Sequence, residues 1–442
     1  MITPSFSITQ DGQFLTIRIH APYANIAESE VEYSERTFYF NAAPYFLRLY
    51  FPCEIVDDET GSTDYEADTG HFTVKVPKKN VNEHFPNLDM LNELLKPPTI
   101  SARPAVEEIG EENMEDDAEI DDSEVYADQK LREQEKAPEL VEITTYGYGF
   151  GWQRHNVFSR FDEDIVKKLV SIPSPDTFAT SERVSCCVMI TAEEFTSDHY
   201  LSDLLEPPEN LMSTIRFDVI PSKHFEITQD DRDRMKDLPA KRVLPTVNDQ
   251  AVAYSLIDIM AAYLYDFRFT EGDDNVESGW TITQLAPTLS FLVRWTLAEE
   301  AVVGFARRAV TKPCYRSWEL LNIVLQDVVA TFKQGRSALL HCLLQLQRIM
   351  NTSGDFRYLF NDLFITDYCL WIQSVDEAVL TNVTRELEEA VQKLTKADVD
   401  CDLEELELEA NMYLMSLNTS GGSLTIEQVI PPLDSDDEEY PN

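Results

Sequence analysis

The chain has 442 residues, 43% of them hydrophobic, which is enough for two or three domains with sizeable cores. Its net charge of −44 argues against direct nucleic-acid binding, which needs a basic surface, and favours a basic partner. Seven irregularly spaced cysteines indicate buried thiols in a reducing compartment. With no signal peptide and no apolar run near the ~18 residues of a membrane span, we expect a soluble intracellular protein without a membrane partner.

Residues 1–98 have the pattern of an antiparallel β-sandwich. In "FLTIRIHAP", Leu15, Ile17 and Ile19 alternate with polar residues, and "YFLRLYFP" and "GHFTVKVPKK" repeat this alternation. Turn-forming stretches such as "TQDGQ" and "DETGSTD" separate the runs. A short apolar piece, "LDMLNELL", closes the segment before Pro97 and Pro98.

Two segments are rich in acidic residues and poor in basic ones. Residues 99–139 contain 15 acidic and 4 basic residues and almost no aromatics, so we expect a disordered linker. Residues 418–442 contain six acidic residues and no basic residue, and we expect an acidic tail.

Residues 140–417 are expected to form a mainly α-helical domain. The interval 140–248 is mixed and proline-rich, which suggests short helices and loops. After residue 249 a period near 3.6 dominates, and "DQAVAYSLIDIMAAYLYDFRF" places one apolar stripe on a helix: Val252, Leu256, Ile259, Tyr263 and Phe267.

Several helix ends can be predicted from residue type. Pro313 is expected in the first turn of one helix and Gly335 at its end. The next helix should end at Ser353-Gly354. The runs "VDEAVLTNVTRELEEAVQKLTK" and "DLEELELEANMYLMSL" indicate a final pair of helices.

The stretch "RFTEGDDNVESGWTITQL", Arg268 to Leu285, is a candidate Ca²⁺ loop because four acids lie beside glycines. Its acids lack the alternating ladder of an EF-hand. We interpret it as a solvated loop joining two helices, with Ser278 or Thr281 capping the second one.

A second candidate Ca²⁺ loop is "DVDCDLEELELE", which puts Asp398, Asp400, Asp402 and Glu409 at positions 1, 3, 5 and 12. Leu403 occupies the position where the sharp turn of an EF-hand needs glycine. The alternative is a helix N-cap provided by Asp400 or Asp402.

The glycine-rich stretch "TTYGYGFGW", Thr144 to Trp152, has the spacing G-x-G-x-G rather than that of a phosphate-binding loop, and no Walker lysine occurs. Glycines alternating with aromatics fit a close backbone crossing better. No H-x-x-x-H, C-x-x-C or G-x-S-x-G motif is present. We therefore predict no catalytic residue, no cofactor and no metal, hence no enzyme.

The candidate partner-binding residues are exposed acids and aromatics. The acids lie in the tail "PPLDSDDEEYPN" and the aromatics beside the glycines: Asp434, Asp436, Asp437, Glu438, Glu439, Tyr146 and Phe150. Ser435, followed by four acids, suits an acidophilic kinase, although an unmodified solubilising tail explains the same composition.

Two sets of motifs carry a family resemblance. The N-terminal pattern "TPSFSITQDGQFLTIRIHAPYA…NAAPYFLRLYFP…YEADTGHFTVKVPK" resembles a CS domain, the small heat-shock fold. "YGYGFG", "EGDDNVESGWTITQLAPTLSFLVRW", "YRSWEL", "GRSALLHCLLQL" and "LFNDLFITDYCLWIQ" are similar to the helical domain of the Shq-type assembly chaperones of H/ACA ribonucleoproteins. The resemblance covers 1–98 and 140–417.

The resemblance implies a non-enzymatic chaperone that binds a dyskerin-type pseudouridine synthase before guide RNA does, and covers its RNA-binding surface. It also implies release with the AAA+ ATPases pontin and reptin, and residence in nucleus and cytoplasm; we expect a monomer. One alternative is a CS-domain co-chaperone of the ninety-kilodalton heat-shock ATPase, for which residues 1–98 show no complete contact motif. Another is a metal-dependent enzyme built on the acidic loops.

Overall fold

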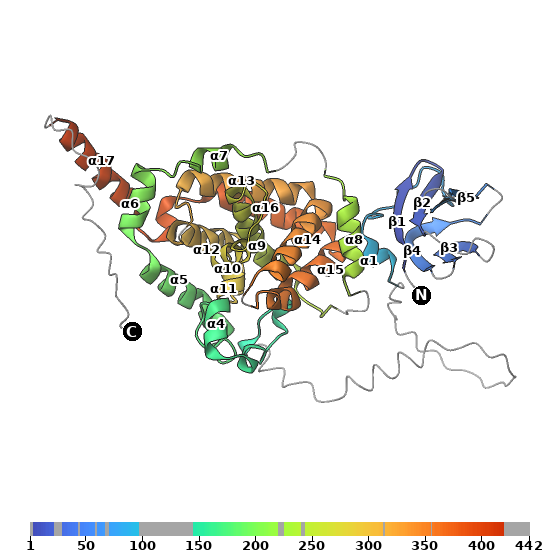
Figure 1. The fold of residues 1–442 in the computed structure, drawn as a ribbon, viewed down its shortest axis with the longest axis horizontal. Helices are drawn as coiled ribbons and strands as arrows, with labels where there is room; N and C mark the ends of the chain where they lie inside the picture. Colours follow the sequence, from blue (N-terminus) through green and yellow to red (C-terminus); the bar gives the residue numbers. More distant parts are fainter. Residues whose placement is uncertain are drawn as a thin grey trace, which may run out of the picture. The chain divides into compact units, whose positions relative to one another are not determined.

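The computed structural model describes two compact units (Figure 1). The first contains 1–147, 226–245 and 368–374, and the second contains 148–225, 246–367 and 375–442. The residues that the structure describes are 3–21, 29–42, 45–57, 60–66, 70–96, 145–219, 225–239, 244–312, 314–354 and 356–419. The predicted linker 99–139 lies outside them, and so does the tail from residue 420 on.

The first unit is built around a sandwich of two antiparallel sheets, as the sequence predicts. One sheet has the strand order β1-β2-β6-β5, and the other pairs β3 with β4. The strands are β1 (Ser5–Gln10), β2 (Phe14–His20), β3 (Glu30–Ala42), β4 (Tyr45–Ile55), β5 (Ser62–Glu66) and β6 (His71–Pro77).

The strand register explains the core of the sandwich. Leu15 faces Val76 across β2 and β6, and Ile17 faces Val74. All four of these side chains are buried, and the alternation predicted from "FLTIRIHAP" and "GHFTVKVPKK" is confirmed. Since successive residues of a strand point to opposite faces, a shift of one residue would expose the whole set.

The first unit also contains helical pieces from distant parts of the sequence. The apolar piece "LDMLNELL" includes helix α1 (Leu91–Leu94), which packs on α8 (Gln229–Asp237). Asn92 and Gln373 form two buried hydrogen bonds. The backbone N–H of Asn92 donates to Oε1 of Gln373 at 3.0 Å, and Nε2 of Gln373 donates to Oδ1 of Asn92 at 2.9 Å. Gln373 lies in α15 (Thr366–Ser374), within the part of that helix assigned to this unit.

The second unit is mainly helical. The interval 145–248 forms short helices joined by loops, as predicted: η2 (Phe150–Trp152), η3 (Phe158–Arg160), α4 (Glu163–Leu169), η4 (Thr180–Glu182), α5 (Arg183–Glu194), α6 (Ser197–Leu205) and α7 (Leu211–Arg216). Longer helices follow: α9 (Asp249–Phe269), α10 (Ser278–Leu285), α11 (Pro287–Ser290), α12 (Ala298–Thr311), α13 (Trp318–Gln334), α14 (Arg336–Thr352), π-helix η5 (Asn361–Ile365), α16 (Glu377–Lys393), η6 (Lys396–Val399) and α17 (Leu403–Thr419).

Helix α9 is the centre of the second unit, and four residues of the predicted apolar stripe are buried as expected: Val252, Leu256, Ile259 and Tyr263. Every residue from Ala251 to Asp266 is buried, whereas Phe267, placed on the predicted stripe, is only half-buried. The reason is that α10, α12, α13 and α16 all pack against it, so its polar face is enclosed as well.

Most helix ends lie where the sequence puts them. Gly335 ends α13 with φ of 84°, and α14 ends at Thr352, directly before Ser353. The predicted start of this helix is wrong, since residues 314–317 are not helical and α13 begins at Trp318; Pro313 itself lies outside the described residues. Ser317 caps α13 by accepting a hydrogen bond from the amide of Leu320.

Across the described ranges, none of the helices combines the length and the apolar character that crossing a bilayer requires.

Candidate interaction surfaces

The glycine-rich stretch is a backbone crossing, as the sequence suggests. Gly149 has φ of 75°, and a Cβ built on it would lie 2.8 Å from the carbonyl oxygen of Leu363. A Cβ on Gly151, with φ of 62°, would lie 2.3 Å from Cγ1 of Val247. Protein atoms therefore occupy the space that a phosphate would need above these glycines.

Tyr148, between two of these glycines, belongs to a buried polar network. Its hydroxyl donates to Asp176 Oδ1 at 2.5 Å and accepts from the amide of Val157 at 2.7 Å. Arg183 lies over its ring and donates to the Leu292 carbonyl at 3.0 Å. Burial lowers the pKa of Arg183 to about 10, so its guanidinium is still charged at neutral pH. The network holds the short helices together and offers no group to a ligand.

The two aromatic candidates for partner contact differ in accessibility. Phe150 is 2% exposed and belongs to the core, while Tyr146 is half-buried. Their role in binding stays a prediction. The predicted tail contacts lie outside the described residues: Asp434, Ser435, Asp436, Asp437, Glu438 and Glu439.

The first candidate Ca²⁺ loop is a connector between α9 and α10. Asp274 forms a two-pronged ion pair with Arg348, so this acid serves the fold. The predicted cap is wrong, because Glu277 occupies the N-cap without a side-chain bond. Ser278 Oγ instead accepts from the amide of Asn275 at 3.0 Å, upstream of the helix.

Two acids of the second candidate Ca²⁺ loop bind neighbouring residues of the chain. Asp398 accepts from the amide and the hydroxyl of Thr395, and Asp400 pairs with Arg307. In the described part of the chain, no group of three or more His, Cys, Asp or Glu side chains is arranged to hold a metal ion.

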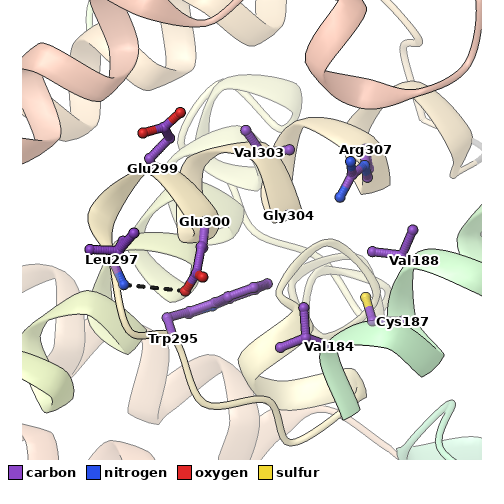
Figure 2. A pocket seen from close by; sticks show the side chains of 10 residues that line it. All are labelled: Val184, Cys187, Val188, Trp295, Leu297, Glu299, Glu300, Val303, Gly304 and Arg307. Carbon is purple, nitrogen blue, oxygen red and sulfur yellow. Dashed lines mark hydrogen bonds between the residues drawn. The ribbon is translucent and has the colours of Figure 1, made fainter. Parts of the chain in front are cut away.

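A cavity of about 340 Å³ lies between α5 and α12 (Figure 2). Val184, Val188, Trp295 and Val303 make its walls mostly apolar.

Two charged groups of this cavity are held by neighbouring residues. Glu300 accepts from the amide of Leu297 at 3.2 Å (Figure 2). Arg307 donates to the Asp398 carbonyl at 2.9 Å. Burial raises the pKa of Cys187 to about 11, which keeps its thiol protonated and a poor nucleophile. The cavity therefore suits an apolar side chain better than a reaction.

Other thiols behave as core residues as well. Burial raises the pKa of Cys314 to about 12 and that of Cys401 to about 11. All seven cysteines are free. Five of them are buried, as expected, while Cys53 and Cys314 are only half-buried.

Helix α17 combines acids with exposed apolar side chains. Leu408 and Met412, one turn apart, are 61% and 62% exposed. Glu407 anchors the helix by accepting from the Tyr200 hydroxyl at 2.6 Å and pairing with Lys396. Leu408 and Met412, together with the exposed Glu404 and Glu405, give the helix an acidic and apolar surface.

Family models match both regions of the chain. The model "SHQ1-like, CS domain" matches residues 3–95, and the model "SHQ1 protein, Shq1 domain" matches residues 218–403. The first range coincides with the sandwich and α1. The second runs from the end of the short-helix interval through η6.

Full-length relatives decide the family. "Protein SHQ1 homolog" of Caenorhabditis elegans is 40% identical over 428 residues, which is 95% of this chain and 99% of that protein. The chain belongs to the SHQ1 family. "Protein SHQ1 homolog" of Xenopus tropicalis is 36% identical, covering 98% of this chain and 73% of that protein. "Protein shq1" of Schizosaccharomyces pombe is 27% identical over 96% of this chain and all of that protein.

SHQ1 proteins form a chaperone-type family, and the resemblance recognised in the sequence is thereby confirmed. Sequence reasoning did not find two features of this SHQ1 chain. One is the buried arginines, Arg183 and Arg308, both 0% exposed. The other is a pair of exposed aromatics in the loop after α14, Phe356 and Tyr358. The exposed aromatics could have been suspected from the sequence "DFRYLF", in which aromatic residues flank an arginine.

Proposed function

We propose that the chain is an assembly chaperone for H/ACA small nucleolar ribonucleoproteins. It binds the dyskerin-type pseudouridine synthase before RNA does and occupies the RNA-binding surface as a placeholder. Membership of the SHQ1 family carries this proposal. The net charge of −44 supports it, because a polyanion suits a surface built to bind RNA.

The charge also predicts how binding responds to salt. The acidic side chains of the protein contact the same basic side chains of the synthase that bind RNA. Forming these contacts displaces both the RNA and the counterions bound there. Affinity for the RNA-free synthase should fall steeply as salt rises from 50 to 300 mM. A flat response would mean that the acidic surface contributes little.

Competition with guide RNA is the decisive experiment. Purified full-length chain is immobilised and loaded with the synthase, and H/ACA guide RNA is then added. We expect the synthase to leave as RNA binds it. A stable ternary complex, with RNA on its usual surface, would overturn the placeholder mechanism.

The tail supplies a matched pair of variants. Replacing Asp434, Asp436, Asp437, Glu438 and Glu439 by their amides should weaken binding, and shuffling the order of residues 434–439 should not. Equal affinity of both variants would remove the tail from the interface. A further variant, Ser435→Ala, tests whether a kinase modifies this serine.

The remaining parts of the proposal concern partners and place. The chain acts as a monomer in nucleus and cytoplasm, and pontin and reptin take part in its release. Light scattering of the chain and of its complex tests the stoichiometry. Binding of the full chain to the ninety-kilodalton heat-shock ATPase, with no binding to the synthase, would favour the co-chaperone alternative.

A further inference from the structure

The loop after α14 exposes two aromatic side chains and buries the arginine between them. Phe356 and Tyr358 are 43% and 46% exposed, whereas Arg357 and Leu359 between and beyond them are 5% and 7% exposed. Folding alone favours the opposite, with rings inside and the guanidinium in water. The buried residues anchor the loop, since Arg357 Nη1 donates to the Gly354 carbonyl at 3.2 Å.

The backbone of this loop is strained at an aromatic residue. Phe356 has φ of 61°, in the left-handed region that large side chains rarely adopt. Such strain persists where the surroundings impose it, and it gathers at binding sites. Here it turns an aromatic ring outward at the molecular surface.

A third ring extends the pair into a cluster. The rings of Phe161 and Phe356 lie 6.2 Å apart at 62°, and those of Phe356 and Tyr358 lie 6.2 Å apart at 53°. We call these three residues the aromatic cluster. Phe356 and Tyr358 are each more than 40% exposed, so part of each ring is accessible to another group.

The aromatic cluster has no cation of its own. Elsewhere in the molecule Arg48 lies over Tyr39 and Tyr50, and Arg294 lies over Trp152. Within the ranges that the structure describes, no lysine or arginine lies over a ring of the aromatic cluster.

Acids follow one member of the aromatic cluster along the chain. Phe161 is followed by three exposed acids, Asp162, Glu163 and Asp164, at the start of α4. Glu163 forms an exposed ion pair with Lys167 at 3.8 Å. Aromatic faces beside carboxylates form a site for a cationic side chain.

We propose that the aromatic cluster receives an arginine or lysine side chain from the basic surface of the partner synthase. This inference rests on the proposed function and adds a specific anchor to it. The ring faces attract the cation, and Asp162 and Asp164 complement its charge. The cluster fixes the register of a contact that charge alone would leave loose.

Calorimetry of the full-length chain with the RNA-free synthase tests this. Tyr358→Phe keeps the ring and should bind as the wild type does. Tyr358→Leu keeps apolar area without the ring face, and affinity should fall about fivefold. The double variant Phe356→Asn/Tyr358→Leu should lose about 30-fold.

Two controls separate binding from folding. Asparagine adopts the left-handed region readily, so Phe356→Asn should leave the melting temperature unchanged or raised while affinity falls. Val276→Asn changes a side chain that is 75% exposed in the α9–α10 loop and should leave affinity unchanged.

The outcomes are distinguishable. If the wild type does not bind the synthase, the proposed function and this inference fall together. If the wild type binds and the double variant binds equally well, only the inference is overturned. Equal losses for Tyr358→Phe and Tyr358→Leu would overturn it too, because the hydroxyl rather than the ring face would then carry the contact.

Discussion

The sandwich and the helical unit differ in how many polar and charged side chains they bury. Among the described residues of 3–96, the buried polar or charged side chains are Lys78 and Asn92. In the helical unit Arg183, Arg308 and Asp258 are each 0% exposed. The sandwich is thus held by apolar alternation, and the helical unit by enclosed ionic and hydrogen-bonded groups as well.

Arg308 shows what the helical unit gains and risks. It donates to the Gln284 carbonyl at 2.7 Å and to Glu194 at 2.8 Å, joining α10, α12 and α5. A fully satisfied network specifies one arrangement of helices, while a network missing one member leaves a buried group without compensation. Substituting one buried polar residue should therefore lower the stability of the helical unit more than substituting an exposed residue lowers the stability of the sandwich.

The largest effect is expected for Arg183→Met. It leaves the carbonyls of Pro175, Phe178 and Leu292 without a donor, and we expect a loss of about 4 kcal/mol in the free energy of unfolding. Denaturant titration followed by tryptophan fluorescence reports mainly on the helical unit, because four of the five tryptophans lie in it and Trp371 lies in the segment 368–374 of the first unit. Arg294→Met, an exposed arginine over Trp152, is the control and should cost less than 1 kcal/mol.

The next effect concerns close packing rather than charge. A Cβ on Gly279 would lie 2.6 Å from Cβ of Ser353 and 3.3 Å from Cδ of Arg357. Gly279→Ala should destabilise by about 2 kcal/mol, because the loop that carries the aromatic cluster must move. Ser353→Gly in the same chain should restore most of the loss.

Gly354→Ala provides the matched control for this pair. A Cβ on Gly354 meets nothing within 4 Å, so the change should be nearly neutral. If Gly279→Ala is equally neutral, the loop is free to shift, and the strain at Phe356 is not imposed by its neighbours.

How far the sequence predicts this molecule follows from the same comparison. The sandwich was predictable because each strand shows a polar and an apolar face, as with Leu15 and Ile17. Helix α9 was not, because Ser255, Asp258 and Asp266 read as a solvent face although they are buried. The spacing of polar residues in a sequence shows which face of a helix is polar. It does not show whether those residues find hydrogen-bond partners inside the fold.

The candidate site shows the same limit. The glycine crossing was predictable from residue type and spacing. The outward rings of Phe356 and Tyr358 were not, because apolar residues are ordinarily assigned to the core. Their exposure depends on Arg357 being held inside, which is a tertiary property.

The buried carboxyl of Asp258 predicts a pH effect confined to the helical unit. Burial raises the pKa of Asp258 to about 7 from a value near 3.8, and its Oδ2 accepts from the amide of Thr288 at 2.7 Å. Between pH 4 and 7 the folded chain holds a proton that the unfolded chain has lost. Stability therefore falls as pH rises through this window, and the loss persists above it.

Asp258→Asn removes this titration and keeps an acceptor for Thr288. Relative to wild type, the variant should gain about 2 kcal/mol in the free energy of unfolding between pH 5 and pH 8. Ile257→Val, on the same helix, should shift stability by the same amount at both values, because it changes no ionisable group. A constant difference for Asp258→Asn as well would show that its carboxyl keeps its charge inside the fold.

The smallest effect is expected on the outside of the sandwich. The Arg48 guanidinium lies 4.8 Å from the ring centre of Tyr39 and 5.1 Å from that of Tyr50, on an exposed side chain. Water screens such a contact, so Arg48→Ala should cost about 0.5 kcal/mol, as measured by amide hydrogen exchange in β3 and β4. A loss near that of Arg183→Met would mean that the sandwich, too, depends on its charges. The contrast between the two units would then reflect only where their arginines lie, not how each unit is held together.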